Sequence, residues 1–132
     1  MRKGEIMALT WEHVHLDRKH VYLPRTKNGS DRKVPLSSRA IALFGLLTQG
    51  RPTQRVVRVA SASTFGIYFR EAAAEAGIKG MTFHDSRREA LTRASTRLSN
   101  VAELARASGH KKLQNLMVYF EPEVEDLADK LG

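Results

Sequence analysis

Seven polar side chains that could act on a phosphate diester are spread along this chain of 132 residues. In chain order they are Arg2, Glu5, Lys27, His84, Arg87, His110 and Tyr119. Guanidinium groups can grip phosphate oxygens bidentately. A tyrosine hydroxyl becomes a nucleophile when a base or a nearby positive charge helps to remove its proton. Each residue taken singly is usually a packing or surface residue, but the ordered combination predicts a site that handles phosphate.

Short elements near the amino terminus are expected to position the first three of these residues. Residues 2–9 have the apolar spacing of a helix, with nothing to cap its amino terminus. Two β-like runs, 20–23 and 33–36, flank an Asn-Gly pair, which is the strongest short signal for a hairpin. Lys27 is therefore expected near a hairpin tip. Pro35 restricts its strand to a sheet edge or to bulged pairing, because proline donates no ladder hydrogen bond.

Helices are expected to position the remaining candidates. Thr82 with Asp85 resembles a capping box, which places His84 and Arg87 in the first turns of a helix that runs to Ser95. Other predicted elements are helices after Ser37 or Ser38, from Ser63 to Gly77, after Asn100, from about Leu113 to Phe120 and from Val124 to Leu131, and a short strand at Val56–Val59.

The composition is that of a globular chain and excludes several classes of protein. Hydrophobic residues make up 42% of the chain, which is too many for a disordered protein. Cysteine is absent, which excludes disulfide frameworks, thiolate metal sites and cysteine nucleophiles. No apolar run approaches the roughly 18 residues of a membrane span, and no signal-peptide core follows the first residues. One soluble, intracellular domain is expected.

The charge of the chain is unevenly distributed. The whole chain carries a net charge of +8, and residues 121–132 hold five acids and one lysine. The acidic tail therefore leaves a net charge of +12 on residues 1–120. A surplus of this size favours a polyanionic partner, because each neutralised phosphate releases condensed counterions.

The candidate residues lie in five motifs that resemble those of one protein family. The motifs are Met1-Arg2-Lys3-Gly4-Glu5-Ile6-Met7-Ala8-Leu9 as a first arginine box, Thr26-Lys27-Asn28-Gly29 as a lysine-bearing turn, His84-Asp85-Ser86-Arg87-Arg88 as a second box, Ser108-Gly109-His110 as a Leu-Gly-His element, and Met117-Val118-Tyr119. In this order they resemble the tyrosine recombinase, or phage integrase, family over essentially the whole chain. Ser86 replaces the usual leucine, and Arg88 stands where a second histidine is frequent.

The resemblance implies a mainly α fold with a small antiparallel β-hairpin or sheet, as in the DNA breaking-rejoining catalytic domains of tyrosine recombinases. Residues 1–132 would form a catalytic domain without its first helices and without the N-terminal core-binding domain. The acidic C-terminal helix within residues 121–132 would either be exchanged between protomers or pack back on its own domain. Packing back is the outcome expected for an isolated fragment.

The resemblance also implies a reaction in which Tyr119 becomes joined to a 3′-phosphate and leaves a free 5′-hydroxyl. Arg2 and Arg87 would clamp the non-bridging phosphate oxygens, on which negative charge develops. The phosphotyrosine retains the bond energy, so rejoining needs no ATP. Cationic side chains would take the place of a metal ion, so that no cofactor is expected.

The other candidates would assist this transfer. Lys27 is expected to protonate the leaving 5′-oxygen as the general acid. His84 and His110 could each accept a proton or hydrogen-bond the phosphoryl oxygens, and the sequence leaves these two roles open. Glu5 is expected to orient a charged neighbour.

Double-stranded DNA of bacterial or phage origin is the expected partner. The full-length protein would act as a tetramer on DNA, in the bacterial cytoplasm at the nucleoid and away from membranes, and this fragment would be a monomer. Six further basic residues are candidates for backbone contacts, which position a duplex without reading its sequence. They are Arg88, Arg93, Arg97, Arg106, Lys111 and Lys112.

Three alternatives remain open. The same fold could bind DNA without cleaving it, or could cleave and reseal one strand as type IB topoisomerases do. A metal site could use His84, Asp85 and His110, or His13 and His15, although few acidic partners lie at ligand spacing. Recombination by this chain alone is not expected, because the resemblance places its first residue inside the catalytic domain.

Overall fold

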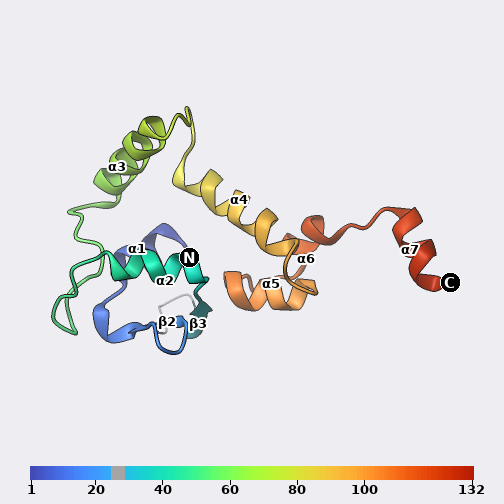
Figure 1. Cartoon of the computed structure of the whole chain (residues 1–132), viewed down its shortest axis with the longest axis horizontal. Helices are drawn as coiled ribbons and strands as arrows, with labels where there is room; N and C mark the ends of the chain where they lie inside the picture. Colours follow the sequence, from blue (N-terminus) through green and yellow to red (C-terminus); the bar gives the residue numbers. More distant parts are fainter. Residues whose placement is uncertain (25–28) are drawn as a thin grey trace. The chain divides into compact units, whose positions relative to one another are not determined.

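The computed structural model describes residues 1–24 and 29–132 (Figure 1). Lys27, the predicted general acid, lies outside the described residues. The chain forms two compact units, Met1–Arg88 and Glu89–Gly132. Its elements are mainly helices with one small antiparallel sheet, which confirms the predicted fold class.

The first unit contains a short helix and a three-stranded sheet. They are α1 (Lys3–Ala8), the 3-10 turn η1 (Trp11–His13), β1 (Val14–His15), β2 (His20–Leu23) and β3 (Arg32–Pro35). The strands follow the order β1-β2-β3, and β2 and β3 pair antiparallel with Val21 opposite Val34. This confirms the predicted pairing, and Pro35 lies on an edge strand as expected. The two-residue strand β1 was not predicted.

Apolar side chains from the sheet and its flanking segments form the core of the first unit. The buried members are Leu9, Trp11, Val21, Leu23, Val34 and Val56. The predicted strand at Val56–Val59 does not form. An isolated antiparallel bridge pairs Arg55 with Thr10 instead, just before η1. The Val56 N–H group donates a hydrogen bond to the Leu9 carbonyl at 2.9 Å, which fixes the buried valine in the core.

Three helices follow the sheet, each beginning at a capping residue. They are α2 (Ser38–Gly45), α3 (Ala62–Glu75) and α4 (Phe83–Ser95). Ser37 Oγ accepts a hydrogen bond from the Ala40 backbone at 3.2 Å, and Ser61 Oγ accepts one from Thr64 at 3.1 Å. The prediction for α2 is confirmed, whereas α3 begins one residue before the predicted Ser63.

The start of α4 is held by a capping box and by aromatic packing. Asp85 accepts a hydrogen bond from the Thr82 backbone at 2.9 Å, and Thr82 Oγ1 accepts one from the Asp85 backbone at 3.2 Å. The Phe83 ring meets Phe65 and Phe69 of α3 edge-to-face, with ring centroids 5.3 and 5.5 Å apart. These contacts anchor the turn of α4 that carries the predicted His-x-x-Arg motif.

The second unit contains the last turns of α4 and four shorter elements. They are α5 (Val101–Ser108), α6 (Gln114–Met117), the 3-10 turn η2 (Val118–Phe120) and α7 (Val124–Leu131). Asn100 caps α5 as predicted, with Oδ1 accepting from the Glu103 backbone at 3.0 Å. The core of the second unit consists of Leu104, Ala105 and Leu116. The single helix predicted near 113–120 forms as α6 followed by η2.

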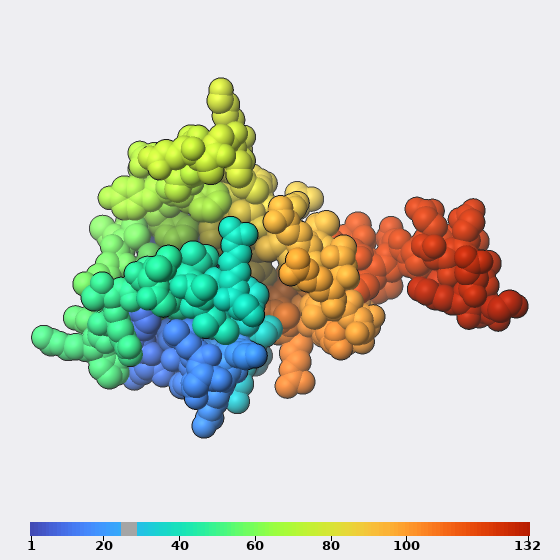
Figure 2. Space-filling model, viewed as in Figure 1, coloured from blue at the N-terminus to red at the C-terminus, as the bar shows by residue number. Residues whose placement is uncertain are grey.

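The apolar stripe of the C-terminal helix α7 is exposed. Figure 2 draws this helix in red at the end of the chain. Val124 is 75% exposed, Leu127 44% and Leu131 88%. Whether this helix packs back on its own domain or is exchanged between protomers stays a prediction. Among the described residues, no helix is both long and apolar enough to cross a membrane.

Candidate active site

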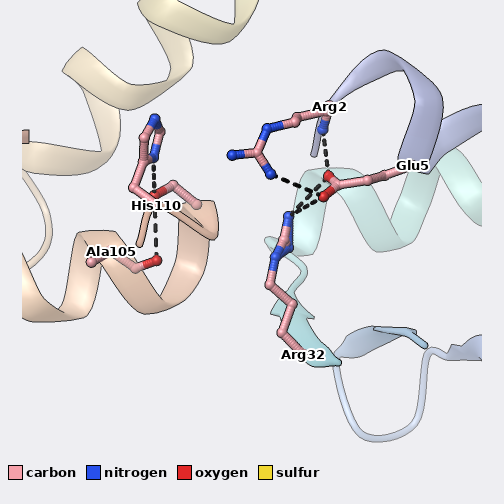
Figure 3. Close-up of polar contacts among 6 residues, drawn as sticks. Arg2, Glu5, Arg32, Ala105 and His110 are labelled. Carbon is pink, nitrogen blue, oxygen red and sulfur yellow. Dashed lines mark hydrogen bonds and ion pairs between the residues drawn. The ribbon is translucent and has the colours of Figure 1, made fainter. Parts of the chain in front are cut away.

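One carboxylate at the start of α1 holds the first candidate arginine. Glu5 accepts a hydrogen bond from the Arg2 backbone at 2.6 Å, and its Oε1 lies 3.4 Å from Arg2 Nη1 (Figure 3). The expectation that nothing caps this helix is wrong, because the Glu5 side chain reaches back one turn to its first N–H group. Glu5 therefore bonds Arg2, and its role in orienting this charged neighbour stays a prediction.

The same carboxylate binds a second arginine, Arg32 of β3, which sequence reasoning missed. Arg32 Nη2 lies 2.9 Å from both carboxylate oxygens of Glu5 (Figure 3). The Arg32 and Glu5 side chains are only 16% and 19% exposed. Strand alternation could have revealed this residue, since Arg32 shares the inward face of β3 with Val34 and a charge on that face needs a partner.

Opposing effects act on the ionisation of Glu5. Burial alone raises the pKa of the Glu5 carboxyl, but the Arg2 N–H group and the charges of Arg32 and Arg2 lower that pKa more strongly. The net result is a pKa below the usual value of 4.5. Glu5 is therefore an anion at neutral pH, and it neutralises part of the positive charge of the two arginines.

The second candidate arginine, Arg87, lies on α4 in the first unit. His84 is exposed and Arg87 is half-buried, one turn apart on the same helix. The pKa of the Met1 amine is lowered to about 6. Burial of the amine is the largest cause, and the positive charge of Arg87 is the second. The Glu5, Arg32 and Arg2 charges act on the same amine. Arg2, Arg32 and Arg87 are therefore all close enough to the Met1 amine for their charges to act on it.

In the second unit, the chain turns sharply at the end of α5 and presents His110. Gly109 ends the helix with φ +76°, and its N–H group donates to the Ala105 carbonyl at 2.8 Å. This left-handed conformation turns His110 back toward the helix, where Nδ1 lies 2.7 Å from Ser108 Oγ. Ser108 is buried, with 5% of its surface exposed.

The predicted nucleophile, Tyr119, lies in η2 of the second unit. Its ring is half-buried and packs with Phe120 against the core of Leu104, Ala105 and Leu116. This packing restrains the ring without enclosing it. The predicted nucleophile and His110 thus belong to one unit, and Arg2, Glu5, His84 and Arg87 belong to the other.

The six predicted DNA-contacting residues are all exposed. Arg93 is ion-paired with Glu89 at 2.8 Å, one turn earlier on α4. Trp11 is a core residue, and Tyr22 packs edge-to-face against His13. Within the described part of the chain, no three histidine or acidic side chains are grouped to hold a metal ion. The alternative metal sites therefore gain no support.

Comparison with known families decides the class of this protein. The sequence profile described as the phage integrase family matches residues 1–125. The chain belongs to the phage integrase family. The motif residues of this integrase-family chain, from Arg2 to Tyr119, all lie within the matched range.

Two curated relatives extend the comparison of this integrase-family chain. It is 39% identical over 132 residues to the shufflon-specific DNA recombinase of Escherichia coli, a match that covers 99% of the chain and 34% of that recombinase. It is 37% identical to a Haemophilus influenzae protein named as an integrase/recombinase, covering 99% of the chain and 43% of that protein. The chain therefore spans less than half the length of these relatives.

Two solved structures share the fold. XerA recombinase matches 98% of the integrase-family chain and 50% of its own chain, with a TM-score of 0.77 and 19% identity. The Tn1549 transposon integrase was solved in complex with transposon right end DNA. The match covers 98% of the integrase-family chain and 53% of the Tn1549 chain, with a TM-score of 0.77 and 15% identity. At these identities the likeness establishes the fold alone.

Proposed function

We propose that this chain is the catalytic domain of a site-specific DNA recombinase that cleaves and rejoins DNA through a 3′-phosphotyrosine. The observation that carries the proposal is the match of the phage integrase family to residues 1–125, a range that contains Arg2, Arg87 and Tyr119. Family membership and the DNA bound by the Tn1549 integrase support DNA as the substrate. Acting on DNA, the protein works in the bacterial cytoplasm at the nucleoid.

Each proposed role follows from the chemistry of the side chain. Arg2 and Arg87 bind the non-bridging oxygens of the scissile phosphate, where their paired N–H groups stabilise the developing charge. The Tyr119 oxygen forms a bond to phosphorus as the bond to the 5′-oxygen breaks, and Lys27 gives that oxygen its proton. Rejoining reverses these steps, since the 5′-hydroxyl attacks the phosphotyrosine. The protein itself supplies the cations, so the step needs neither metal nor ATP.

The Glu5 carboxylate and Arg32 support this clamp. Three arginines in one region repel one another, and a single anion that bonds two of them lowers that repulsion. Because Glu5 is anchored by the mostly buried Arg32, it holds the Arg2 backbone and guanidinium near one position before DNA arrives. Preorganised charges cost little rearrangement in the transition state.

Two surfaces fit assembly on DNA. Six exposed basic residues contact the phosphate backbone around the cleavage site. They are Arg88 and Arg93 on α4, Arg97 between α4 and α5, Arg106 on α5, and Lys111 and Lys112 after α5. The uncovered stripe of α7 packs on a neighbouring protomer in a DNA-bound tetramer of the full-length protein. DNA binding by the basic surface and protomer exchange by α7 are thus separate functions of separate segments.

The test is capture of the covalent intermediate. The chain is incubated with duplexes that carry a strand nick beside a randomised sequence, so that the short piece with the free 5′-hydroxyl diffuses away and the adduct accumulates. We expect a protease-sensitive protein–DNA adduct that also forms with a chelator present. Tyr119→Phe should abolish it, because phenylalanine has no nucleophilic oxygen.

A matched tyrosine variant controls this experiment. Tyr68 lies on α3 and is 57% exposed, so Tyr68→Phe removes a phenol without touching the proposed site. Tyr68→Phe should form as much adduct as the unaltered chain. An adduct that persists in Tyr119→Phe contradicts the proposed nucleophile, and binding without any adduct favours a non-catalytic DNA-binding module.

A further inference from the structure

The longest stretch of the chain without an acidic residue lies in the first unit. Residues 32–70 contain seven arginine or lysine residues and neither aspartate nor glutamate. The stretch includes β3, α2 and the loop that joins α2 to α3 (Figure 1). Three of its arginines, Arg51, Arg55 and Arg58, lie in that loop and are exposed. We call residues 50–58 the arginine loop.

The arginine loop carries positive charge that no carboxylate neutralises. Arg32, in the same acid-free stretch, is ion-paired with Glu5. Among the described residues, no carboxylate forms an ion pair with an arginine of the loop. Glu12 lies close by in the chain fold, but its carboxylate binds Thr10 Oγ1 at 3.2 Å and lies 4.0 Å from His13 Nε2. Unneutralised charges on one short segment repel one another, so the loop favours an anionic partner.

Backbone hydrogen bonds hold the arginine loop against the core of the first unit. The Val56 N–H group donates to the Leu9 carbonyl, and the Trp11 N–H group donates to the Gln54 carbonyl at 3.1 Å. Leu9, Trp11 and Val56 are all buried in that core. The exposed arginines therefore extend from a backbone whose course is set by buried residues.

A turn closes the arginine loop at its first arginine. The Gln54 N–H group donates to the Arg51 carbonyl at 3.0 Å, and Gln54 Oε1 accepts from the Arg51 N–H group at 2.9 Å. Pro52 occupies the second position of this turn, where its fixed φ is favourable. A Cβ atom added at Gly50 would lie 3.1 Å from Arg58 Nη2. The Arg58 guanidinium therefore lies beside the residue that precedes Arg51.

We propose that the arginine loop is a contact surface for the phosphate backbone of duplex DNA, in addition to the six basic residues assigned above. The choice of DNA as the partner rests on the proposed function, whereas the surface rests on the charge, exposure and anchoring of the loop. Arginine suits this partner, because its planar guanidinium donates paired N–H groups to phosphate oxygens. An anchored backbone also loses little conformational freedom on binding.

The salt dependence of DNA binding tests this surface. In the triple variant Arg51→Gln, Arg55→Gln, Arg58→Gln, the slope of log K against log salt should fall by about 2.7, since each phosphate contact contributes about 0.9. Arg→Lys changes at the same three positions keep the charge and should keep the slope. Fluorescence anisotropy with two duplexes of unrelated sequence should show the same fall, because backbone contacts do not depend on sequence. A fall confined to one of the two duplexes contradicts a backbone contact.

A second triple variant controls for net charge. Arg18→Gln, Lys19→Gln, Lys79→Gln removes the same charge from exposed positions of the first unit outside the arginine loop. Its slope should change much less than that of the loop variant. Equal falls in the two variants overturn the proposal, and so does an unchanged slope in the loop variant.

Chemical modification tests the unaltered chain and does not depend on the folding of any variant. Phenylglyoxal reacts with exposed arginines, and mass spectrometry of the digested chain measures the reaction at each position. Saturating duplex should slow modification of Arg51, Arg55 and Arg58 several-fold and leave that of Arg18 unchanged. Equal modification of the loop with and without DNA overturns the proposal.

Adduct formation separates this inference from the proposed function. If duplex protects the arginine loop but Tyr119 forms no adduct, the recombinase function fails and the DNA-contact surface stands. If the adduct forms while the loop is neither protected nor needed for the salt dependence, only the present inference fails.

Discussion

The Glu5 carboxylate joins residues that are far apart in the chain but meet in the first unit. It binds Arg2 at the start of α1 and Arg32 on β3, and both the carboxylate and Arg32 are mostly withdrawn from water. A buried ion pair adds little stability over an apolar pair, but loss of one partner is costly because the other charge remains. The pair is therefore better understood as a support for Arg2 than as a source of stability.

Removal of Arg32 should reveal how strongly Glu5 depends on it. In Arg32→Met we expect the free energy of unfolding at neutral pH to fall by about 1–3 kcal/mol, since a charged hydrogen bond is lost and Glu5 stays partly buried. The lowered pKa of Glu5 means that the unfolded state takes up its proton first as the pH falls below about 4.5. The stabilisation from the Glu5 carboxylate is therefore present above that pH and lost below it. Acidification should lower the free energy of unfolding less in Arg32→Met than in the unaltered chain.

Urea unfolding followed by Trp11 fluorescence measures this effect. Trp11 is the single tryptophan and lies in the core of the first unit, so it reports the unfolding of the unit that contains the pair. Arg18→Met is the control, because the Arg18–Asp17 pair is exposed and should contribute about 0–1 kcal/mol. An equal loss of unfolding free energy in the two variants would show that the Glu5–Arg32 pair contributes no more than an exposed ion pair.

Helix ends position the candidate residues of both units. The capping box at Thr82 and Asp85 begins α4 just before its His-x-x-Arg motif, and the Gly109 turn ends α5 just before His110. A residue beside a cap has a defined direction, because the cap sets where regular backbone begins or ends. The chemistry-bearing side chains of these two helices are thus placed by local features.

The same substitution should have opposite effects at two glycines. Gly109 has φ +76°, where a Cβ atom is strained, so Gly109→Ala should lower the stability of its unit by about 1–2 kcal/mol. Gly66 lies inside α3 with open space at its Cβ position, so Gly66→Ala should stabilise the chain by about 0.5–1 kcal/mol. Thermal unfolding followed by circular dichroism gives both values. A stabilising Gly109→Ala would show that the turn before His110 is not held in this conformation.

The whole chain combines a basic body with an acidic, partly uncovered tail. Residues 1–120 carry a net charge of +12, and the apolar stripe of α7 is exposed. The chain spans 34% to 43% of these two curated relatives, and the packing of α7 on a neighbouring protomer is proposed for a full-length protein. The positive charge of residues 1–120 should nevertheless favour DNA binding by this chain alone.

Salt dependence of DNA binding tests where the charge acts. Gln substitutions at both Arg106 and Lys112, which are exposed in the second unit, should reduce the slope of log K against log salt by about 2, since each phosphate contact contributes about 0.9. Gln substitutions at Arg18 and Lys19, in the turn between β1 and β2, remove the same net charge. Fluorescence anisotropy with random duplex should show a smaller change for the second pair, and equal changes would mean that only net charge matters.

Local sequence signals predicted most of the secondary structure. The pairing of β2 with β3, the caps at Ser37, Thr82 and Asn100, and the order of the family motifs depend on neighbours within a few residues, so they could be identified without coordinates. The two-residue β1 and the failed strand at Val56–Val59 escaped this reasoning, because tertiary pairing outweighs propensity in such short segments.

Contacts between distant segments required the folded chain. The motif spacing identified Arg2, Glu5, Arg87, His110 and Tyr119 as a set, because family motifs keep residue type and order. The partners of those residues follow from the path of the backbone: the sheet brings Arg32 to Glu5 across 27 positions, and the Gly109 turn brings His110 onto a buried serine. A linear pattern cannot specify such pairs, because it records neighbours along the chain while charge and hydrogen bonding depend on neighbours in space.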